Sequence, residues 1–182
     1  MGDEFDKYYK KISKCVKETK DKIITYNNEP IKAFYYSMSN GYTESSLNVF
    51  NEELDYLNVI ESKWDEDNQE TITISKDNFC TSLNIECSKI EITNTKKDKS
   101  NRVETIIINN KTYTGIELRK LLNLRSTDFE IIITNSAVNI TTKGYGHGVG
   151  MSQYGANNMA KEGYTYEEIL KYYYQNIEIS NI

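Results

Sequence analysis

The only histidine in the chain, His147, lies in its most glycine-dense segment, where it is the one side chain able to exchange a proton near neutral pH. That segment, residues 144–150, reads Gly-Tyr-Gly-His-Gly-Val-Gly and leads into Met-Ser-Gln. Alternating glycines let a backbone approach a neighbour or a ligand closely, and a helix that begins after them presents free N–H groups to an anion. An imidazole with a purely structural role explains the same pattern equally well.

A second polar segment, residues 37–44, reads Ser-Met-Ser-Asn-Gly-Tyr-Thr-Glu. Its short hydroxyl and amide side chains can hydrogen-bond a sugar or a peptide, and Gly41 permits close approach of the backbone. Taken alone, the segment is better explained as an ordinary turn that feeds a helix capped by Thr43 or Ser45.

Other chemistries have weaker support in the sequence. The glycine-rich segment lacks the Gly-Lys-Ser/Thr end of a phosphate-binding loop and does not match the dinucleotide fingerprint. A catalytic triad of His147 with Ser39 or Ser152 is formally possible, but the chain has no Gly-x-Ser-x-Gly elbow. A glycosidase pair of carboxylates could come from any of the many Asp and Glu residues, and spacing alone does not select one.

The three cysteines, Cys15, Cys80 and Cys87, form no Cys-x-x-Cys motif, and His147 is far from them in sequence. We therefore expect no metal site and no cofactor. Cys80 and Cys87 could form a disulfide in an oxidising compartment. Two unlinked, half-buried thiols are the preferred interpretation.

Composition limits the possible classes of protein. The chain has 182 residues, a formal net charge of −5 and a hydrophobic fraction of 38%. It is long enough for one domain, residues 1–182, with a core of its own. Its acidic balance argues against nucleic acid as a partner, and no stretch reaches the roughly 20 apolar residues of a membrane span.

Periodicity and turn residues predict an α+β domain with a mixed, mostly antiparallel sheet and a few flanking helices. The last helix has the clearest start, because Thr165 and Glu168 have the spacing of a capping box. Residues 94–101 are interpreted as a solvated, charged turn. The expected helices are at 4–19, 115–124, from about 151, and 166–173; the expected β structure is a hairpin of 23–26 with 31–36, then 72–74, 84–92, 102–109 and 129–140.

The segment from Gly144 to Ala156, with Met159–Leu170 and Tyr172-Tyr173, resembles the C-terminal signature of the stage II sporulation protein D family, which includes related amidase-enhancer proteins. Residues 35–44 are similar to the family's serine-glycine-threonine-glutamate loop, and residues 117–129 to its arginine-leucine-serine-phenylalanine block. The resemblance runs from about residue 12 to the end of the chain.

The resemblance implies a role in the cell wall during endospore formation. Family members are lytic transglycosylases that cut peptidoglycan glycan strands and leave 1,6-anhydro-muramyl ends, and they act with a partner amidase and membrane-anchored proteins during engulfment. One carboxyl group can serve as acid and then as base in such a reaction. The implied location is extracytoplasmic, in the intermembrane space of the sporangium, with a membrane anchor on the full-length protein.

The family's principal catalytic glutamate lies in an acidic-Met-Pro segment before an alanine-rich helix, and this sequence contains neither. We therefore expect the chain to be the C-terminal portion of a larger member, without the anchor and the catalytic acid, and inactive alone. Two alternatives are a non-catalytic glycan-binding or amidase-enhancing module and a hydrolase that uses His147. The residues expected to bind substrate are Ser37, Ser39, Asn40, Thr43, Glu44, His147, Gly148, Ser152 and Gln153.

Overall fold

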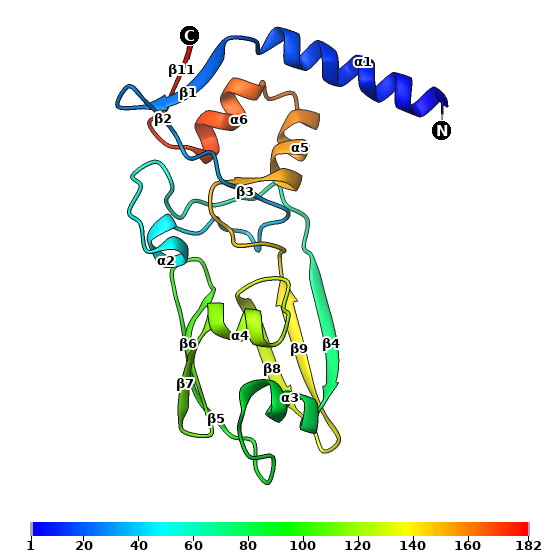
Figure 1. Ribbon diagram of the computed structural model, residues 1–182, viewed down its shortest axis with the longest axis vertical. Helices are drawn as coiled ribbons and strands as arrows, with labels where there is room; N and C mark the ends of the chain where they lie inside the picture. Colours follow the sequence, from blue (N-terminus) through cyan, green and yellow to red (C-terminus); the bar gives the residue numbers. More distant parts are fainter. Residues whose placement is uncertain (1, 182) are drawn as a thin grey trace. The chain divides into compact units, whose positions relative to one another are not determined.

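The computed structural model describes residues 2–181, and they form two compact units (Figure 1). The smaller unit contains the residues up to Lys32 and those from Asn176 onward, and the larger unit contains Ala33–Gln175. Helices and small sheets, mostly antiparallel, occur together, which confirms the α+β class. The expectation of one domain over 1–182 stays a prediction.

In the smaller unit, helix α1 (Gly2–Glu18) precedes a sheet in the order β11-β1-β2, formed by Glu178–Asn181, Lys22–Tyr26 and Glu29–Pro30. The helix and the hairpin were both predicted. Asn27 and Asn28 make the turn at positive φ, which asparagine tolerates better than most residues. The returning strand is only Glu29–Pro30, not 31–36, and a single backbone bond from the Ile31 N–H to the Ile24 carbonyl continues the pairing beyond it.

The larger unit contains two antiparallel sheets of three strands each. One has the order β4-β9-β8 and the other the order β5-β6-β7. The strands are β4 (Gln69–Ser75), β5 (Ile92–Lys97), β6 (Val103–Ile108), β7 (Lys111–Thr114), β8 (Asp128–Ile133) and β9 (Ala137–Lys143).

The prediction of a strand at 84–92 is wrong. Helix α3 (Lys76–Leu83) occupies the preceding residues, with Ser75 accepting a hydrogen bond at its N-terminus and Asn84 ending it in the left-handed conformation. Asparagine adopts that conformation at low cost, so the helix stops there and the chain continues as an irregular loop to β5.

Helices α3 and α4 (Gly115–Leu121) contribute to the same hydrophobic core as the two sheets. Alternate residues of β6 and β9 point into it, as expected for strands with one buried face. The fully buried side chains of this core include Phe79, Ile108, Leu118, Val138 and Ile140.

Short elements complete the larger unit. They are α2 (Ser46–Phe50), α5 (Gln153–Lys161), α6 (Tyr166–Tyr173), and the parallel pair β3 (Tyr35–Tyr36) and β10 (Met151–Ser152). The predicted capping box of α6 is confirmed, since Thr165 and Glu168 bond each other's backbone N–H. Within residues 2–181, no helix combines the length and the apolar character required to cross a bilayer.

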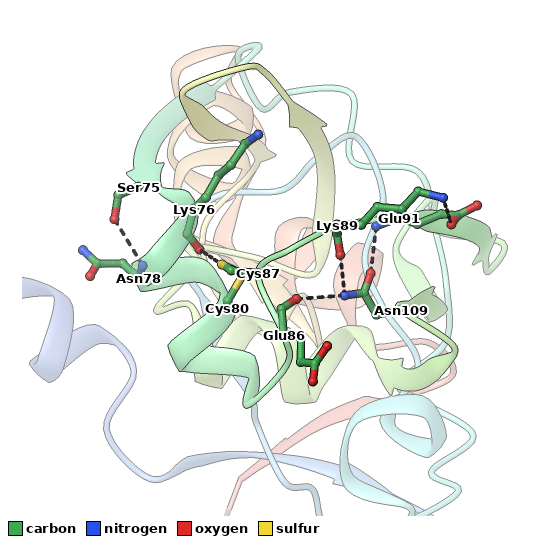
Figure 2. The surroundings of a disulfide bond; sticks show 9 residues. All are labelled: Ser75, Lys76, Asn78, Cys80, Glu86, Cys87, Lys89, Glu91 and Asn109. Atoms are coloured by element: carbon green, nitrogen blue, oxygen red, sulfur yellow. Dashed lines mark hydrogen bonds and ion pairs between the residues drawn. A yellow bond between two sulfur atoms is a disulfide. The ribbon is translucent and has the colours of Figure 1, made fainter.

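Cys80 and Cys87 form a disulfide that ties α3 to the loop after it (Figure 2). The preference for two unlinked thiols is therefore wrong. The reversal of the chain at Asn84 brings the two Cα atoms to 5.7 Å, a separation that a disulfide spans readily. Cys15 on α1 is a free, exposed cysteine.

Candidate functional site

The two polar segments selected from the sequence lie side by side in the larger unit. Met38 and Tyr145 exchange backbone hydrogen bonds of 3.0 and 2.8 Å, and the Glu44 N–H donates to the Gly148 carbonyl at 2.7 Å. Next to them, β3 pairs with β10 in parallel. We call residues 37–44 and 144–153 the paired loops. Their glycines permit this contact: Gly144 has a φ of 72°, and a Cβ there would lie 2.9 Å from backbone atoms of the first loop.

Three of the hydroxyls expected to bind substrate are buried and bonded within the protein. They hold the paired loops to their surroundings and do not point into solvent. Ser39 donates to the Tyr42 carbonyl, Thr43 donates to the Asn58 carbonyl and accepts from the Ile60 N–H, and Ser152 donates to a carboxylate and caps α5.

That carboxylate belongs to Asp65, which the sequence analysis did not select. Asp65 Oδ1 accepts from the Ser39 N–H at 2.8 Å and from Ser152 Oγ at 2.6 Å, while Oδ2 accepts from Ser62 Oγ at 2.7 Å. One side chain thus joins both paired loops. Its position one residue after the only tryptophan, Trp64, in a mixed acidic stretch gave little indication of this role.

His147 is half-buried among aromatic rings. Its ring centroid lies 5.5 Å from that of Phe50 and 5.9 Å from that of Tyr36, and Nδ1 accepts the Val149 N–H at 3.0 Å. Because Nδ1 is an acceptor, the ring proton resides on Nε2. Burial, followed by the positive charge of Arg119, lowers the pKa of His147 and keeps the imidazole neutral. This geometry matches the structural interpretation of the histidine.

The remaining selected residues occupy different environments. Gln153 is exposed, whereas Ser37 and Asn40 are half-buried. The Asn40 side-chain amide donates to the Ser100 carbonyl at 2.8 Å and to Asp128 Oδ2 at 2.9 Å. Gly148 is buried, and a Cβ at this position would meet the Arg102 guanidinium.

A cleft of about 890 Å³ opens beside the first loop. Of the residues selected from the sequence, only Glu44 lines it. The wall combines amide, hydroxyl, charged and aliphatic side chains. Its residues include Glu44, Asn48, Val49, Asn58, Val59, Asp98, Lys99, Arg102, Glu104, Thr105, Thr114 and Ile116.

The Glu44 side chain is 1% exposed and makes hydrogen bonds through both oxygens. Oε1 accepts from the Ser45 N–H at 2.6 Å and from Asn48 Nδ2 at 3.0 Å. Oε2 lies 2.5 Å from Ser100 Oγ and 3.9 Å from Arg102 Nε. Burial raises the pKa of Glu44, and the bond with Ser100 opposes that rise only in part. The cleft therefore contains a carboxyl group whose pKa is raised.

Sequence reasoning missed Asp98, Ser100 and Arg102, because residues 94–101 were expected to be a solvated turn. That expectation is wrong, because residues 94–97 belong to strand β5 and Ser100 is 0% exposed. The adjoining Arg102 is 2% exposed. The alternation of acid, hydroxyl and base at every second position of Asp-Lys-Ser-Asn-Arg was the one available signal.

The chain is similar to several known proteins. It is 41% identical to stage II sporulation protein D of Bacillus subtilis over 184 residues, which cover 98% of this chain and 54% of that protein. Its identity to the Bacillus amyloliquefaciens protein of the same name is 40%, with the same coverage. The amidase enhancer of Bacillus subtilis is 26% identical over 93% of this chain and 32% of its own length. No family model matches the chain.

The fold and the site define an α+β protein with a polar, carboxyl-lined cleft. The comparisons then show that the chain is homologous to stage II sporulation protein D and to the amidase enhancer, which confirms the resemblance found in the sequence. It spans about half the length of the stage II sporulation proteins D that it matches.

Proposed function

We propose that this protein binds glycan strands of peptidoglycan and supplies one wall of the site at which a lytic transglycosylase cleaves them during endospore formation. The observation that carries the proposal is the 41% identity to a stage II sporulation protein D across 98% of the chain. In this proposal the principal catalytic acid comes from outside these 182 residues.

The cleft has the size and chemistry that a sugar requires. Small-molecule sites commonly have volumes of about 300–1,000 Å³ and combine apolar walls with a few polar groups. Here Asn48 and Asn58 can bond hydroxyl and acetamido groups, while Val59 and Ile116 offer apolar surface to a sugar ring. These contacts make the cleft the preferred position for the strand.

The paired loops offer a second surface to the same strand. Tyr145, with the Arg125 guanidinium over one ring face, and Tyr154 in α5 are exposed and can stack on sugar rings. Gln153, next to Tyr154 in the sequence, is exposed as well. The buried residues of the loops, such as Ser39 and Ser152, contribute by holding this surface in shape.

The proposed reaction requires acid and base at a single carboxyl group. The group protonates the oxygen between N-acetylmuramic acid and N-acetylglucosamine, and it then takes the proton from the muramyl 6-hydroxyl as that hydroxyl attacks. The product is a 1,6-anhydro-muramyl end. The contribution of this chain is to bind and orient the strand.

The proposed location is extracytoplasmic, with the full-length protein anchored in the membrane. The disulfide between Cys80 and Cys87 supports this, because disulfides persist in oxidising compartments. The proposed partners are a sporulation amidase and membrane-anchored engulfment proteins, in agreement with the word sporulation in the names of two relatives.

Binding to denuded glycan strands tests the proposal. Asn58→Ala in the cleft and Gln153→Ala on the paired loops should each weaken co-sedimentation with the strands. Asn135→Ala, an exposed change in the turn between β8 and β9, should leave it unchanged. The chain alone should release no anhydromuropeptides. Failure of the unmodified protein to sediment with the strands would refute glycan binding.

A second function, stimulation of an amidase without glycan cleavage, is favoured by the similarity to the amidase enhancer over 93% of the chain. An amidase assay on peptidoglycan separates the two candidates. Stimulation by this chain, with no glycan cleavage even when it is joined to the preceding half of a relative, would favour the second.

A further inference from the structure

The hydroxyl of Ser100 lies between two carboxyl groups. Its Oγ is 2.5 Å from Glu44 Oε2 and 2.7 Å from Asp98 Oδ1. A serine hydroxyl carries one hydrogen, and an ionised carboxylate can only accept. Both contacts are hydrogen bonds only if one of the two carboxyl groups carries a proton. Counting hydrogens therefore places a shared proton in the Glu44–Ser100–Asp98 cluster.

The surroundings of the two carboxyl groups indicate where that proton resides. Asp98 Oδ1 also accepts the backbone N–H groups of Ser100 at 2.8 Å and Arg102 at 3.0 Å, so this oxygen acts as an acceptor in all three of its contacts and does not hold the proton. Glu44 is 1% exposed, and burial favours its neutral form. Its Oε1 accepts two hydrogen bonds, as the carbonyl oxygen of a protonated acid would, which leaves Oε2 as the hydroxyl.

The contact between Arg102 and Glu44 is long and is not a hydrogen bond. The Arg102 side chain is 2% exposed, and its Nε has no hydrogen-bond partner among the described residues. That nitrogen stays 3.9 Å from Glu44 Oε2 and forms no hydrogen bond with it. A buried guanidinium beside an ionised carboxylate would be expected to form such a bond.

Asp98 connects this cluster to the cleft. It is half-buried and lines the cleft together with Glu44 and Arg102. The hydrogen bonds from Ser100 and Arg102 all reach Oδ1, and the Glu44 side chain also interacts with the Asp98 carboxyl group. These bonds to Oδ1 fix the direction of Oδ2, which can accept a hydrogen bond from a hydroxyl donor in the cleft.

We infer that Asp98 is a ligand-contacting residue that accepts a hydrogen bond from a sugar hydroxyl in the cleft, and that Glu44, as a neutral acid, is the positioning residue that aims Ser100 at it. This inference rests on the proposed glycan binding. If the proton is lost, two carboxylates compete for the single Ser100 hydrogen, the support of Asp98 weakens, and the affinity for the ligand falls.

The other charged groups near the cleft do not account for the expected pH dependence of binding. Lys99 and Glu104 line the same cleft, and Lys97 pairs with Asp128 at 3.0 Å. His147, next to the Gly148 that contacts Arg102, is kept neutral by its lowered pKa. A pH response of the cleft above the ordinary carboxyl range is therefore assigned to Glu44.

Carbon-13 NMR of the side-chain carboxyl groups tests the shared proton without any ligand. Glu44 should titrate well above the roughly 4.3 of an ordinary glutamate, and Ser100→Ala should change its midpoint. Glu130→Gln, at an exposed position of β8, is the matched control and should leave the Glu44 midpoint unchanged. A Glu44 signal that titrates in the ordinary range would overturn the inference and leave glycan binding untouched.

Binding of denuded glycan strands as a function of pH tests the role of the cluster. Wild-type affinity should fall by up to several-fold as the pH rises through the Glu44 midpoint and should then level off. Glu44→Gln, whose amide can donate to Ser100 as the neutral acid does, should lose that pH dependence. Asp98→Asn should weaken binding several-fold at every pH. If Asp98→Asn binds as wild type does, or if Glu44→Gln keeps the pH dependence, the inference is wrong.

Discussion

Gly148 lies against the guanidinium group of Arg102, so closely that a Cβ on Gly148 would sit 2.6 Å from Nη2 and 2.8 Å from Cζ. Gly148 also has a φ of 87°, which disfavours any side chain. Arg102 cannot move away freely, because it is buried and its Nη2 bonds Asn40 Oδ1 at 3.3 Å. The glycine-rich segment and the wall of the cleft thus pack directly against each other.

Gly148→Ala should therefore destabilise the protein by about 3 kcal/mol, from backbone strain and overpacking together. Urea unfolding monitored by circular dichroism measures this free energy. Gly163→Ala is the matched control, since Gly163 has a φ of 98° with nothing within 4 Å of its would-be Cβ. The control should cost only about 1 kcal/mol. Equal losses in the two variants would show that the contact with Arg102 is unimportant.

Removal of the disulfide in a Cys80→Ala, Cys87→Ala double variant should reduce the free energy of unfolding by about 2 kcal/mol, the loss expected for a loop this short. The loop is closed between residues separated by 7 positions. Urea unfolding with and without dithiothreitol provides the measurement. Dithiothreitol should weaken the wild-type protein and have no effect on the double variant. Cys15→Ser should behave as wild type, and a wild-type protein insensitive to dithiothreitol would contradict the prediction.

Asp65→Ala should cost about 3 kcal/mol, because three donors from Ser39, Ser62 and Ser152 lose their shared charged acceptor. Thermal unfolding should show the change as a lowered midpoint. Asp67→Ala is suitable as a control, since the exposed Asp67 carboxylate accepts hydrogen bonds from the nearby Gln69 side chain and from no other residue in the described range 2–181. Comparable midpoints for the two variants would argue against the role of Asp65 in joining the paired loops.

His147 should make stability depend on pH in a defined direction. Its folded-state pKa is lowered, so the unfolded chain, with an ordinary value of 6.5, binds the proton more readily. The stabilisation is complete above about pH 6.5 and declines as the pH falls through that value toward the folded-state pKa. Urea unfolding between pH 7.5 and 5.5 should show this decline in wild type, and His147→Gln should lack that part of it. Identical pH profiles would place the imidazole in an unshifted environment.

Local signals in the sequence were sufficient for several elements. The capping box of α6 involves residues three positions apart, and the amphipathic pattern of α1 repeats within single turns, so neither depends on distant residues. The strand expected at 84–92 failed because isolated apolar residues there resembled a strand, while the asparagine cap of α3 and the disulfide determine an irregular path.

The residue types alone were enough to select the two polar segments. They were not enough to predict whether the side chains of these segments are buried or exposed. Ser100 is buried because it contacts Glu44, 56 residues earlier, and composition alone describes its surroundings as a charged turn. Likewise, Ser39 and Thr43 are residue types common in binding loops, and their presence does not show whether the hydroxyls face a ligand or the protein. Only the folded chain distinguishes these cases.

The Tyr154 N–H donates to the Ser37 carbonyl at 3.1 Å and so joins residues that are far apart in the sequence. Loop closure over such a span has a large entropic cost, so we expect this contact to form after the intervening sheets have shortened the distance between its ends. We therefore expect the paired loops to assemble late in folding. A chain whose sheets are incomplete cannot assemble them, and the cleft that depends on Glu44 becomes available only in molecules that have finished folding.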